Sequence, residues 1–280
     1  MKIYKFLSVA LLAIAFSSCS KHTVEFNATP AGDDMAEFQL HYFEAISATA
    51  VNYIDSVFVN DVLYSSVNGS GQLLPYNGVP GGGVGRFFTV KSGENNLKLY
   101  RKGNIVYDQT ITLAKGKQNV FVYDMNKAPI ILDNGHPYQQ DRPSNPETWG
   151  TDSIAYVDFY NFLFETPGVP YSGKLQYQYK AHSEDVEWQN IGEAVAFGEA
   201  TERVQIRIHK EVFNSSGRQK IDYRILTEDG SILQVMNSKG VYYNFSDYWF
   251  GYIGRSYMHI FCGNRSNKSV RVSIKQWTSL

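Results

Sequence analysis

Short runs in which apolar and polar residues alternate dominate this sequence and most constrain its fold. Clear examples run from Arg203 to Ile208 and from Ile221 to Leu226. A period of two places successive side chains on opposite faces of a strand, so each run predicts a β-strand with one face on a core and one in water. Gly, Asn and Asp separate the runs, and no long helical pattern competes with them. The sequence therefore predicts an all-β protein built from antiparallel sheets.

The same pattern occurs on both sides of a proline-rich segment. Residues 134–150 hold three prolines and almost no aliphatic side chains, which is typical of a semi-extended linker. We therefore predict two β-sandwich domains, at residues 37–133 and 151–280. A weak similarity between residues 40–49 and 157–166, at the start of each half, is compatible with two related domains.

The N-terminal segment, residues 1–19, has a basic start and an apolar middle. Two lysines precede an apolar run over residues 6–16, about half the ~20 residues that a membrane-spanning helix needs. Residues 16–19, Phe-Ser-Ser-Cys, resemble the lipobox, at which a peptidase cleaves before the cysteine. The resemblance implies a signal peptide over residues 1–18 and a mature chain that begins at Cys19, lipidated on sulfur and on its amine by chains such as palmitate. An ordinary secretory signal with a chance cysteine is the alternative.

Lipidation would tether the folded body to a membrane, because each buried acyl CH₂ contributes about 0.8 kcal/mol. Residues 19–36 show no apolar periodicity and are predicted to be the tether. We expect an outer-membrane location in the cell envelope. Residues 20–23 contain no acidic cluster that would resemble the surface-export signal of such lipoproteins. This favours the periplasmic face over the cell surface.

The charge balance excludes one class of partner. The chain has 26 Lys+Arg and 27 Asp+Glu, a formal net charge of -1. Removing the two leader lysines leaves 24 basic residues against 27 acidic ones, or -3 for the predicted mature chain. Nucleic-acid binding normally requires a basic patch or stripe and a raised isoelectric point, so nucleic acid is excluded as a partner.

Four segments of the first half share a pattern with a known family: residues 56–61, 74–76, 90–97 and 113–122. They resemble an uncharacterised family of extracellular immunoglobulin-like domains found in lipoproteins of the Bacteroidota type. The resemblance covers residues 37–133 and extends loosely over 151–280. It implies an immunoglobulin-like β-sandwich in the cell envelope and transfers no catalytic residue. The chain departs from the family pattern at Asp61, where a turn glycine is usual, and in an insertion around residues 78–85.

Histidine and cysteine residues form no recognisable catalytic or metal-binding motif. Residues 258–262 read as a strand, in which His259 and Cys262 are three positions apart and point to opposite faces. We interpret Cys262 as a buried thiol that acts as a small apolar side chain. The six histidines have no metal-ligand spacing, so we predict no metal and no cofactor.

Acidic pairs are the remaining candidates for catalysis. Glu199 with Glu202 and Glu228 with Asp229 would suit a glycosidase only if two carboxylates shared a cleft. Solvated turn charges are the simpler interpretation. We predict that the protein is not an enzyme, with a hydrolase as the least favoured alternative.

Residues 242–252 contain seven aromatic rings with polar residues and glycine between them. Aromatic faces flanked by polar side chains are what a sugar-binding platform requires, and a strand cannot turn all of its rings inward. The alternative is that the rings fill a sandwich core. The candidate ligand-binding residues are Tyr242, Tyr243, Tyr248, Trp249 and Tyr252.

Ser56 and Ser153 each follow an aspartate and precede an apolar residue, a triplet that resembles the O-glycosylation motif of this bacterial group. The function predicted from the whole sequence is a non-catalytic binding or structural role for a membrane-anchored envelope lipoprotein, with a glycan or an envelope protein as its partner. The alternative is a glycan-binding accessory of a carbohydrate uptake system.

Overall fold

The computed structural model describes residues 32, 34–44, 46, 50–66, 74, 87–133, 135, 154–182, 186–208, 214–267 and 271–279. The predicted signal peptide, the lipidation site Cys19, Ser153 and nearly all of the predicted linker lie outside these residues. Ala31–Leu280 group into one compact unit, and the fold below concerns that unit.

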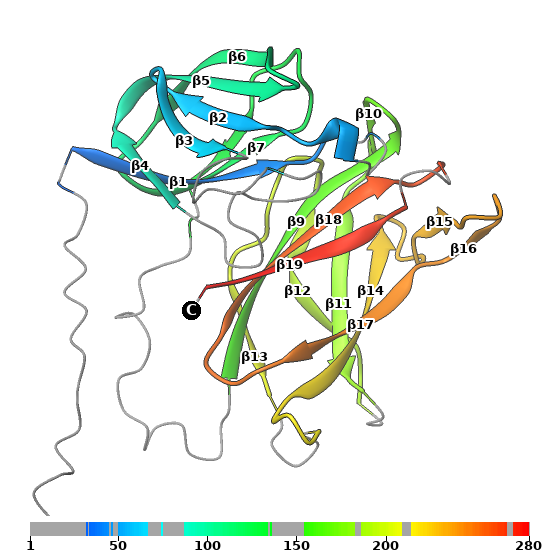
Figure 1. Cartoon of the computed structure of the whole chain (residues 1–280). Helices are drawn as coiled ribbons and strands as arrows, with labels where there is room; N and C mark the ends of the chain where they lie inside the picture. Colours follow the sequence, from blue (N-terminus) through cyan, green and yellow to red (C-terminus); the bar gives the residue numbers. More distant parts are fainter. Residues whose placement is uncertain are drawn as a thin grey trace, which may run out of the picture. The chain divides into compact units, whose positions relative to one another are not determined.

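The described residues are almost entirely β-structure, as the alternating pattern predicted (Figure 1). The strands of the first half are β1 (Met35–Tyr42), β2 (Ser56–Val59), β3 (Val62–Ser66), β4 (Phe87–Lys91), β5 (Gly93–Arg101), β6 (Asn104–Leu113), β7 (Gly116–Val122) and β8 (Ile130–Leu132). Those of the second half are β9 (Ile154–Thr166), β10 (Val169–Pro170), β11 (Leu175–Ala181), β12 (Gln189–Val195), β13 (Val204–Arg207), β14 (Gln219–Thr227), β15 (Gln234–Met236), β16 (Tyr242–Asn244), β17 (Ser246–Gly251), β18 (Ser256–Asn264) and β19 (Ser273–Ser279). A short 3₁₀ helix, η1, spans Ala50–Asn52. In this part of the chain no helix is long and apolar enough to cross a membrane.

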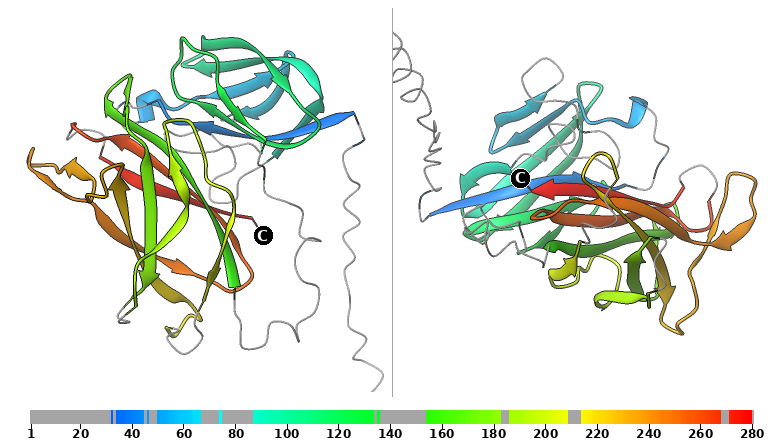
Figure 2. Two further views of the ribbon diagram at one scale, coloured as in Figure 1. Left: turned by 180° about the vertical axis from the view of Figure 1, so that it is seen from behind. Right: turned by 90° about the horizontal axis from the view of Figure 1, so that it is seen from below.

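The two halves share one sheet topology. The first half has sheets in the orders β4-β1-β7-β8 and β3-β2-β5-β6. In the second half β13 and β18 flank β9, β19 follows β18, and the second sheet runs β12-β11-β14-β17 (Figure 2). Strands β1 to β8 therefore correspond, in chain order, to β9, β11, β12, β13, β14, β17, β18 and β19. The second half adds β10 and the two-stranded β15–β16 sheet. This correspondence agrees with the weak sequence similarity at the start of the halves.

Most strand pairs are antiparallel, as predicted, but β1 pairs with β7 and β9 with β18 in parallel. In both cases the first strand of a half joins a strand near its end, after the chain has passed through the opposite sheet. Alternation records which face of a strand is buried and not the direction of its partner, so the sequence pattern could not reveal these pairs.

Each half buries its own apolar core between its two sheets. The first core includes Phe38, Leu40, Val57, Leu97 and Val120. The second is built by inward-facing residues that include Val157, Tyr177, Ile221, Tyr223, Ile225, Trp249 and Phe261. Strands β11 and β14 alternate between buried and half-buried residues along most of their length, which confirms the predicted period of two.

A third buried cluster joins the outer face of β1 and β7 to the outer face of β9 and β18. Its members are Phe43, Phe121, Tyr160, Phe162, Met258, Ile260 and Cys262. The Phe121 and Phe162 rings stack with centroids 4.4 Å apart, and the His41 ring stacks on Phe121 at the same distance. The sheet that contains β1 and β7 therefore packs on the sheet that contains β9 and β18, in addition to the packing of sheets within each half. The expectation that one face of each strand meets water is wrong for β9 and β18.

Buried polar groups accompany these rings. The His41 imidazole lies 3.2 Å from the Asn119 amide oxygen, and the Asn119 amide nitrogen donates to the Tyr160 hydroxyl at 3.5 Å. The Tyr160 hydroxyl donates in turn to the Asp158 carboxylate at 3.1 Å. Because buried polar groups are costly without partners, this chain of contacts favours one relative placement of the paired sheets.

The turn between β2 and β3 contains Asp61, where the sequence resemblance led us to expect a glycine. Asn60 and Asp61 have φ values of 51° and 63°, a left-handed pair that a two-residue hairpin requires and that glycine adopts most easily. Asp61 accepts a hydrogen bond from the Lys98 ammonium group at 2.7 Å, so the aspartate gains a contact that glycine lacks.

We expect Phe121→Ala to destabilise the protein by about 3–5 kcal/mol, because the fully buried ring would leave a cavity in the shared cluster. Denaturant unfolding measures the loss. Leu63→Ala is the control, since Leu63 is 50% exposed and its truncation should change stability by no more than about 0.5 kcal/mol. A loss below about 1 kcal/mol for Phe121→Ala would show that the cluster contributes little.

Candidate functional site

The aromatic segment 242–252 divides between solvent and core. Tyr242 and Tyr243 lie on β16 and are 42% and 43% exposed, and Tyr248 on β17 is 50% exposed. Phe245 and Trp249 point into the second core. The prediction that a strand cannot bury every ring is confirmed, because alternation along β17 places neighbouring rings on opposite faces.

Trp249 presents no ring face to a ligand. Its indole is 7% exposed and meets the rings of His259 and Tyr257 edge-on, at centroid distances of 4.6 and 4.8 Å. Tyr252 is half-buried, and its backbone N–H donates to the Tyr257 hydroxyl at 2.7 Å. The five predicted ligand-binding residues therefore do not form one platform.

His259 and Cys262 lie on opposite faces of β18, as predicted. His259 is buried in the second core 3.1 Å from the Tyr177 hydroxyl, and burial lowers its pKa to about 3. Cys262 is buried in the shared cluster, where burial raises the pKa of its thiol to about 12. A neutral imidazole and a protonated thiol that diverge do not form a nucleophile and base.

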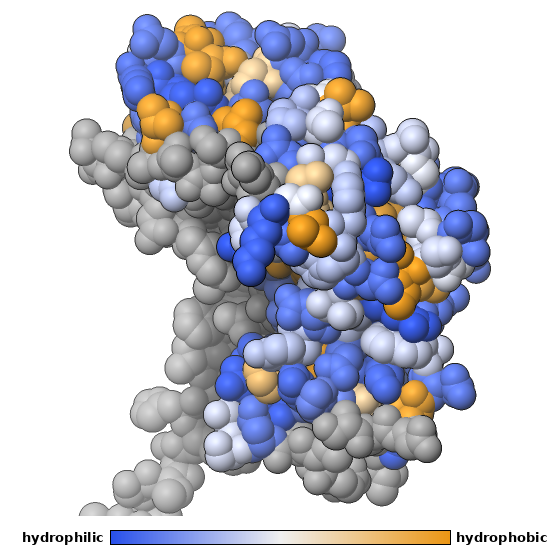
Figure 3. All heavy atoms as spheres, turned by 90° about the vertical axis from the view of Figure 1, so that its right-hand side faces the viewer, coloured by the Kyte–Doolittle hydropathy of each residue, from blue (hydrophilic) through white to orange (hydrophobic). Residues whose placement is uncertain are grey.

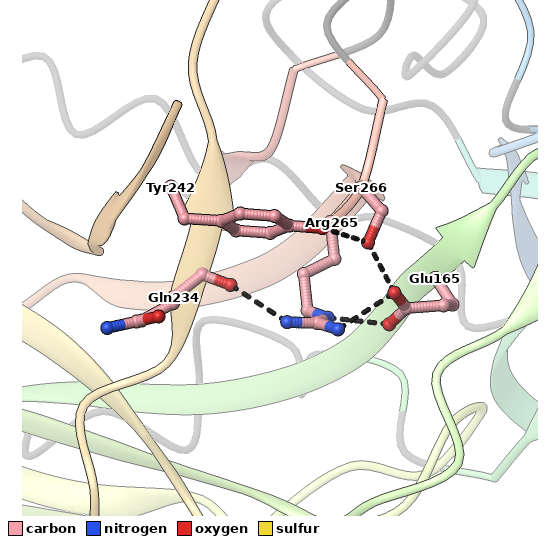
Figure 4. Close-up of polar contacts among 5 residues, drawn as sticks. All are labelled: Glu165, Gln234, Tyr242, Arg265 and Ser266. Carbon is pink, nitrogen blue, oxygen red and sulfur yellow. Dashed lines mark hydrogen bonds and ion pairs between the residues drawn. The ribbon is translucent and has the colours of Figure 1, made fainter. Parts of the chain in front are cut away.

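An ion-pair cluster holds the β15–β16 hairpin against the ends of β9 and β18. The Arg265 guanidinium donates two hydrogen bonds to the Glu165 carboxylate, at 2.5 and 2.8 Å. Ser266 also donates to Glu165 and accepts a 2.8 Å hydrogen bond from the Tyr242 hydroxyl. Figure 4 shows the Tyr242 ring and the Gln234 carbonyl beside the guanidinium. A bidentate contact of this kind fixes the plane of the arginine.

Two tyrosine rings flank the same guanidinium. Arg265 lies 5.7 Å from the centroid of Tyr171 and 5.6 Å from that of Tyr242, within the range of cation–π attraction. Partial burial alone would raise the pKa of Glu165, but hydrogen bonds from Arg265 and Ser266 and the arginine charge together lower it. Glu165 is therefore ionised at neutral pH and holds Arg265 in place.

An open depression with a volume of ≈ 540 Å³ lies beside this cluster. It is lined by Tyr171, Thr227, Ser231, Ile232, Leu233, Gln234, Asn244 and Arg265. The lining combines the Tyr171 phenol, two amides, two aliphatic hydroxyls and a guanidinium, and none of these described residues carries a carboxylate. Such a set can donate and accept hydrogen bonds to a polar ligand and pack against one apolar face.

The molecular face drawn in Figure 3 is mainly hydrophilic, and its apolar residues form small separate spots. Monomeric proteins that bind partners through apolar contacts expose larger continuous patches. On this face, polar recognition is therefore the better supported mode of binding.

The other predicted site residues that the structure describes lie in strands or make local hydrogen bonds. Ser56 begins β2 and is half-buried. Glu199 accepts a hydrogen bond from the backbone of Ala196, and Asp229 accepts hydrogen bonds within the turn after β14. Within the described ranges no group of three or more His, Cys, Asp or Glu side chains could hold a metal ion.

Sequence reasoning identified Tyr242 but missed Tyr171, Gln234, Asn244 and Arg265. Glu165 and Arg265 are 100 positions apart, and neither belongs to a recognisable motif. Only the pairing of β9 with β18, which aligns Phe164 with Asn264, brings the two side chains to one end of the sheet.

No family model matches this sequence, and no curated protein matches it. Two solved structures, each named a "putative cell adhesion protein", are similar in part. The one from Bacteroides uniformis matches 87% of this chain and 97% of its own at 9% identity, with a TM-score of 0.23. The one from Parabacteroides distasonis matches 88% and 99% at 8% identity, with a TM-score of 0.19.

A leucine-rich repeat protein from Bacteroides thetaiotaomicron matches 84% of this chain at 8% identity, with a TM-score of 0.22, and this chain covers 26% of that protein. TM-scores this low carry no argument about fold or function. The resemblance to an immunoglobulin-like lipoprotein family therefore remains a prediction from the sequence.

We expect the Glu165–Arg265 contact to add a pH-dependent term to stability. The pKa of Glu165 in the folded protein lies below its ordinary value of 4.5, so the stabilisation is present above that value and is lost as the pH falls through the folded pKa. The stabilities of wild type and Glu165→Gln should differ most near pH 7, and the difference should shrink as the pH falls below 4.5. A difference that stays constant from pH 7 to 3 would contradict this.

Proposed function

We propose that the protein is a non-catalytic carbohydrate-binding protein of the cell envelope, and that the ligand occupies the depression beside the β15–β16 hairpin. The observation that carries this proposal is the combination of an aromatic ring, two amides and an oriented guanidinium around one open hollow. No carboxylate lines the hollow, so the site supports binding better than general acid–base hydrolysis.

The lining suits the chemistry of sugars. A sugar ring presents hydroxyls at its edge and C–H groups on its face, so it needs hydrogen-bonding partners beside an aromatic surface. Gln234 and Asn244 lie opposite each other in the β15–β16 pairing, and their side chains are joined at 3.4 Å. Arg265 is held in place by Glu165 and supplies N–H donors in one plane to the lining of the depression. Donors that are held in place reduce the entropy lost on binding.

Membrane anchoring is the second part of the proposal, and it rests on the lipobox-like residues 16–19. A lipid on Cys19 would hold the binding domain at the outer membrane, where polysaccharides are available as ligands. Delivery of a bound glycan to an uptake system is compatible with this placement. A Cys19→Ala protein that still sediments with membranes would refute the anchor.

We expect one or more neutral polysaccharides from a panel of xylan, mannan, galactan, starch and chitin to bind the full-length protein. Asn244→Ala and Gln234→Ala should each weaken that binding about tenfold, because each removes one to two hydrogen bonds worth about 1 kcal/mol apiece. Isothermal titration calorimetry measures the affinity.

Gln205→Ala is the matched control, since Gln205 is exposed on β13 and belongs to no described site. Its affinity should equal that of wild type. Failure of every neutral polysaccharide to bind, or equal weakening by Gln205→Ala, would contradict the proposed site.

A further inference from the structure

The outer face of the β12-β11-β14-β17 sheet carries a second group of aromatic rings. Tyr177, Ile221 and Trp249 of this sheet point into the second core. On each strand, alternation turns every second residue to the opposite, outer face. The residues that face outward include Lys180, Lys220, Arg224, Tyr248 and Phe250.

On this outer face and beside it, positively charged groups lie over aromatic rings. Lys220 is 4.0 Å from the Tyr248 centroid, Arg218 is 4.6 Å from Phe250, Arg224 is 4.3 Å from Trp188 and Arg255 is 4.0 Å from Tyr252. Lys180 also lies over Trp188, at 5.5 Å. We define the cation–aromatic face as these nine residues: Lys180, Trp188, Arg218, Lys220, Arg224, Tyr248, Phe250, Tyr252 and Arg255.

The cations of this face form no ion pairs with carboxylates of the described residues. Asp222 lies between Lys220 and Arg224 on β14 and adds one negative charge to this face. Its carboxylate is 2.8 Å from His182 Nδ1, and His182 Nε2 is 3.3 Å from the Lys220 ammonium group. Five cations on and beside the face outnumber this carboxylate and form a local positive potential that attracts anions.

The rings hold the cations in an orientation suited to anion binding. A guanidinium that stacks on a ring keeps its N–H groups at its edge, where they can donate to a carboxylate or sulfate. The ring also restricts the long side chain before any ligand arrives, which lowers the entropy cost of binding. Tyr248 is 50% exposed, so part of its ring remains available for contact with a ligand.

Fixed amides cross the same face. The Arg224 Nε group donates to the Gln178 amide oxygen at 2.9 Å, and the Gln178 amide nitrogen donates to the Asn190 amide oxygen at 2.8 Å. Register places Gln178 between Asn190 and Arg224. The face therefore offers charged donors, aromatic surface and neutral hydrogen-bonding groups within a sheet about 14 Å wide.

We propose that the cation–aromatic face binds a linear polysaccharide that bears carboxylate or sulfate groups. The cations pair with the anionic substituents, while the amides and Tyr248 contact hydroxyls and sugar rings. An acidic polypeptide would also pair with the cations and hydrogen-bond to the amides, but a sugar ring adds a C–H face that packs on the exposed Tyr248 ring, so the polysaccharide fits the whole face better. This surface is separate from the depression beside the hairpin, and either can fail without the other.

The test measures binding of the full-length protein to two anionic polymers, polygalacturonate and dextran sulfate. Their uncharged counterparts are methyl-esterified polygalacturonate and dextran. We expect at least one anionic polymer to bind at least tenfold more tightly than its counterpart and to weaken as NaCl rises from 50 to 200 mM. The double variant Arg218→Gln/Lys220→Gln should weaken this binding by at least tenfold.

Lys115→Gln/Lys174→Gln is the matched control, because it removes the same charge at exposed positions outside both surfaces and should bind as wild type does. Lys220→Gln alone, expected to weaken binding about threefold or more, serves if the double variant does not fold. Asn244→Ala should leave anionic binding unchanged, which distinguishes this surface from the depression. Binding of neither anionic polymer, equal loss in the lysine control, or equally tight binding of polyglutamate would overturn the proposal.

Discussion

Burial of β9 and β18 on both faces is the constraint on which the rest of the structure depends. One face of each strand fills the second core, and the other packs on the rings of the first half through Phe121 and Phe162. These two parallel strands therefore belong to two cores at once. A face that is buried between two sheets cannot bind a ligand. Recognition by the second half therefore falls to the β12-β11-β14-β17 sheet and to the ends of β9 and β18.

That division explains where the polar and aromatic side chains are found. The outer face of the β12-β11-β14-β17 sheet has no third layer over it in the described residues, and it carries cations over rings. The end of the β9-β18 pair carries the Glu165–Arg265 contact and the depression beside β15 and β16. In both places an arginine is oriented by its neighbours before any ligand arrives, through a carboxylate in one case and through aromatic rings in the other.

The sequence predicted the strands well because alternation is a local signal. The positions of β13 and β14 follow from it, and so does the divergence of His259 and Cys262. Phe121 and Phe162 could not be assigned to a shared cluster, because an apolar residue at an alternating position looks the same whether it meets its own core or another sheet. Trp249 was mistaken for a ligand-binding residue for a related reason: a run of rings does not show which of them face inward.

Long-range pairing was beyond the reach of such signals. Arg265 meets Glu165 only after β18 has paired with β9 in parallel, and the cation–aromatic face requires four strands in one register. Shared topology of the two halves was suggested by one weak similarity, at residues 40–49 and 157–166. The structure extends that similarity to the order of the strands in both sheets of each half.

We expect the shared cluster to make the described halves one cooperative unit, although the sequence predicted two domains joined by a linker. Differential scanning calorimetry of the full-length protein tests it most directly. A single transition whose calorimetric and van't Hoff enthalpies agree is the predicted result. Two resolved transitions, each with the enthalpy of about half the chain, would contradict it.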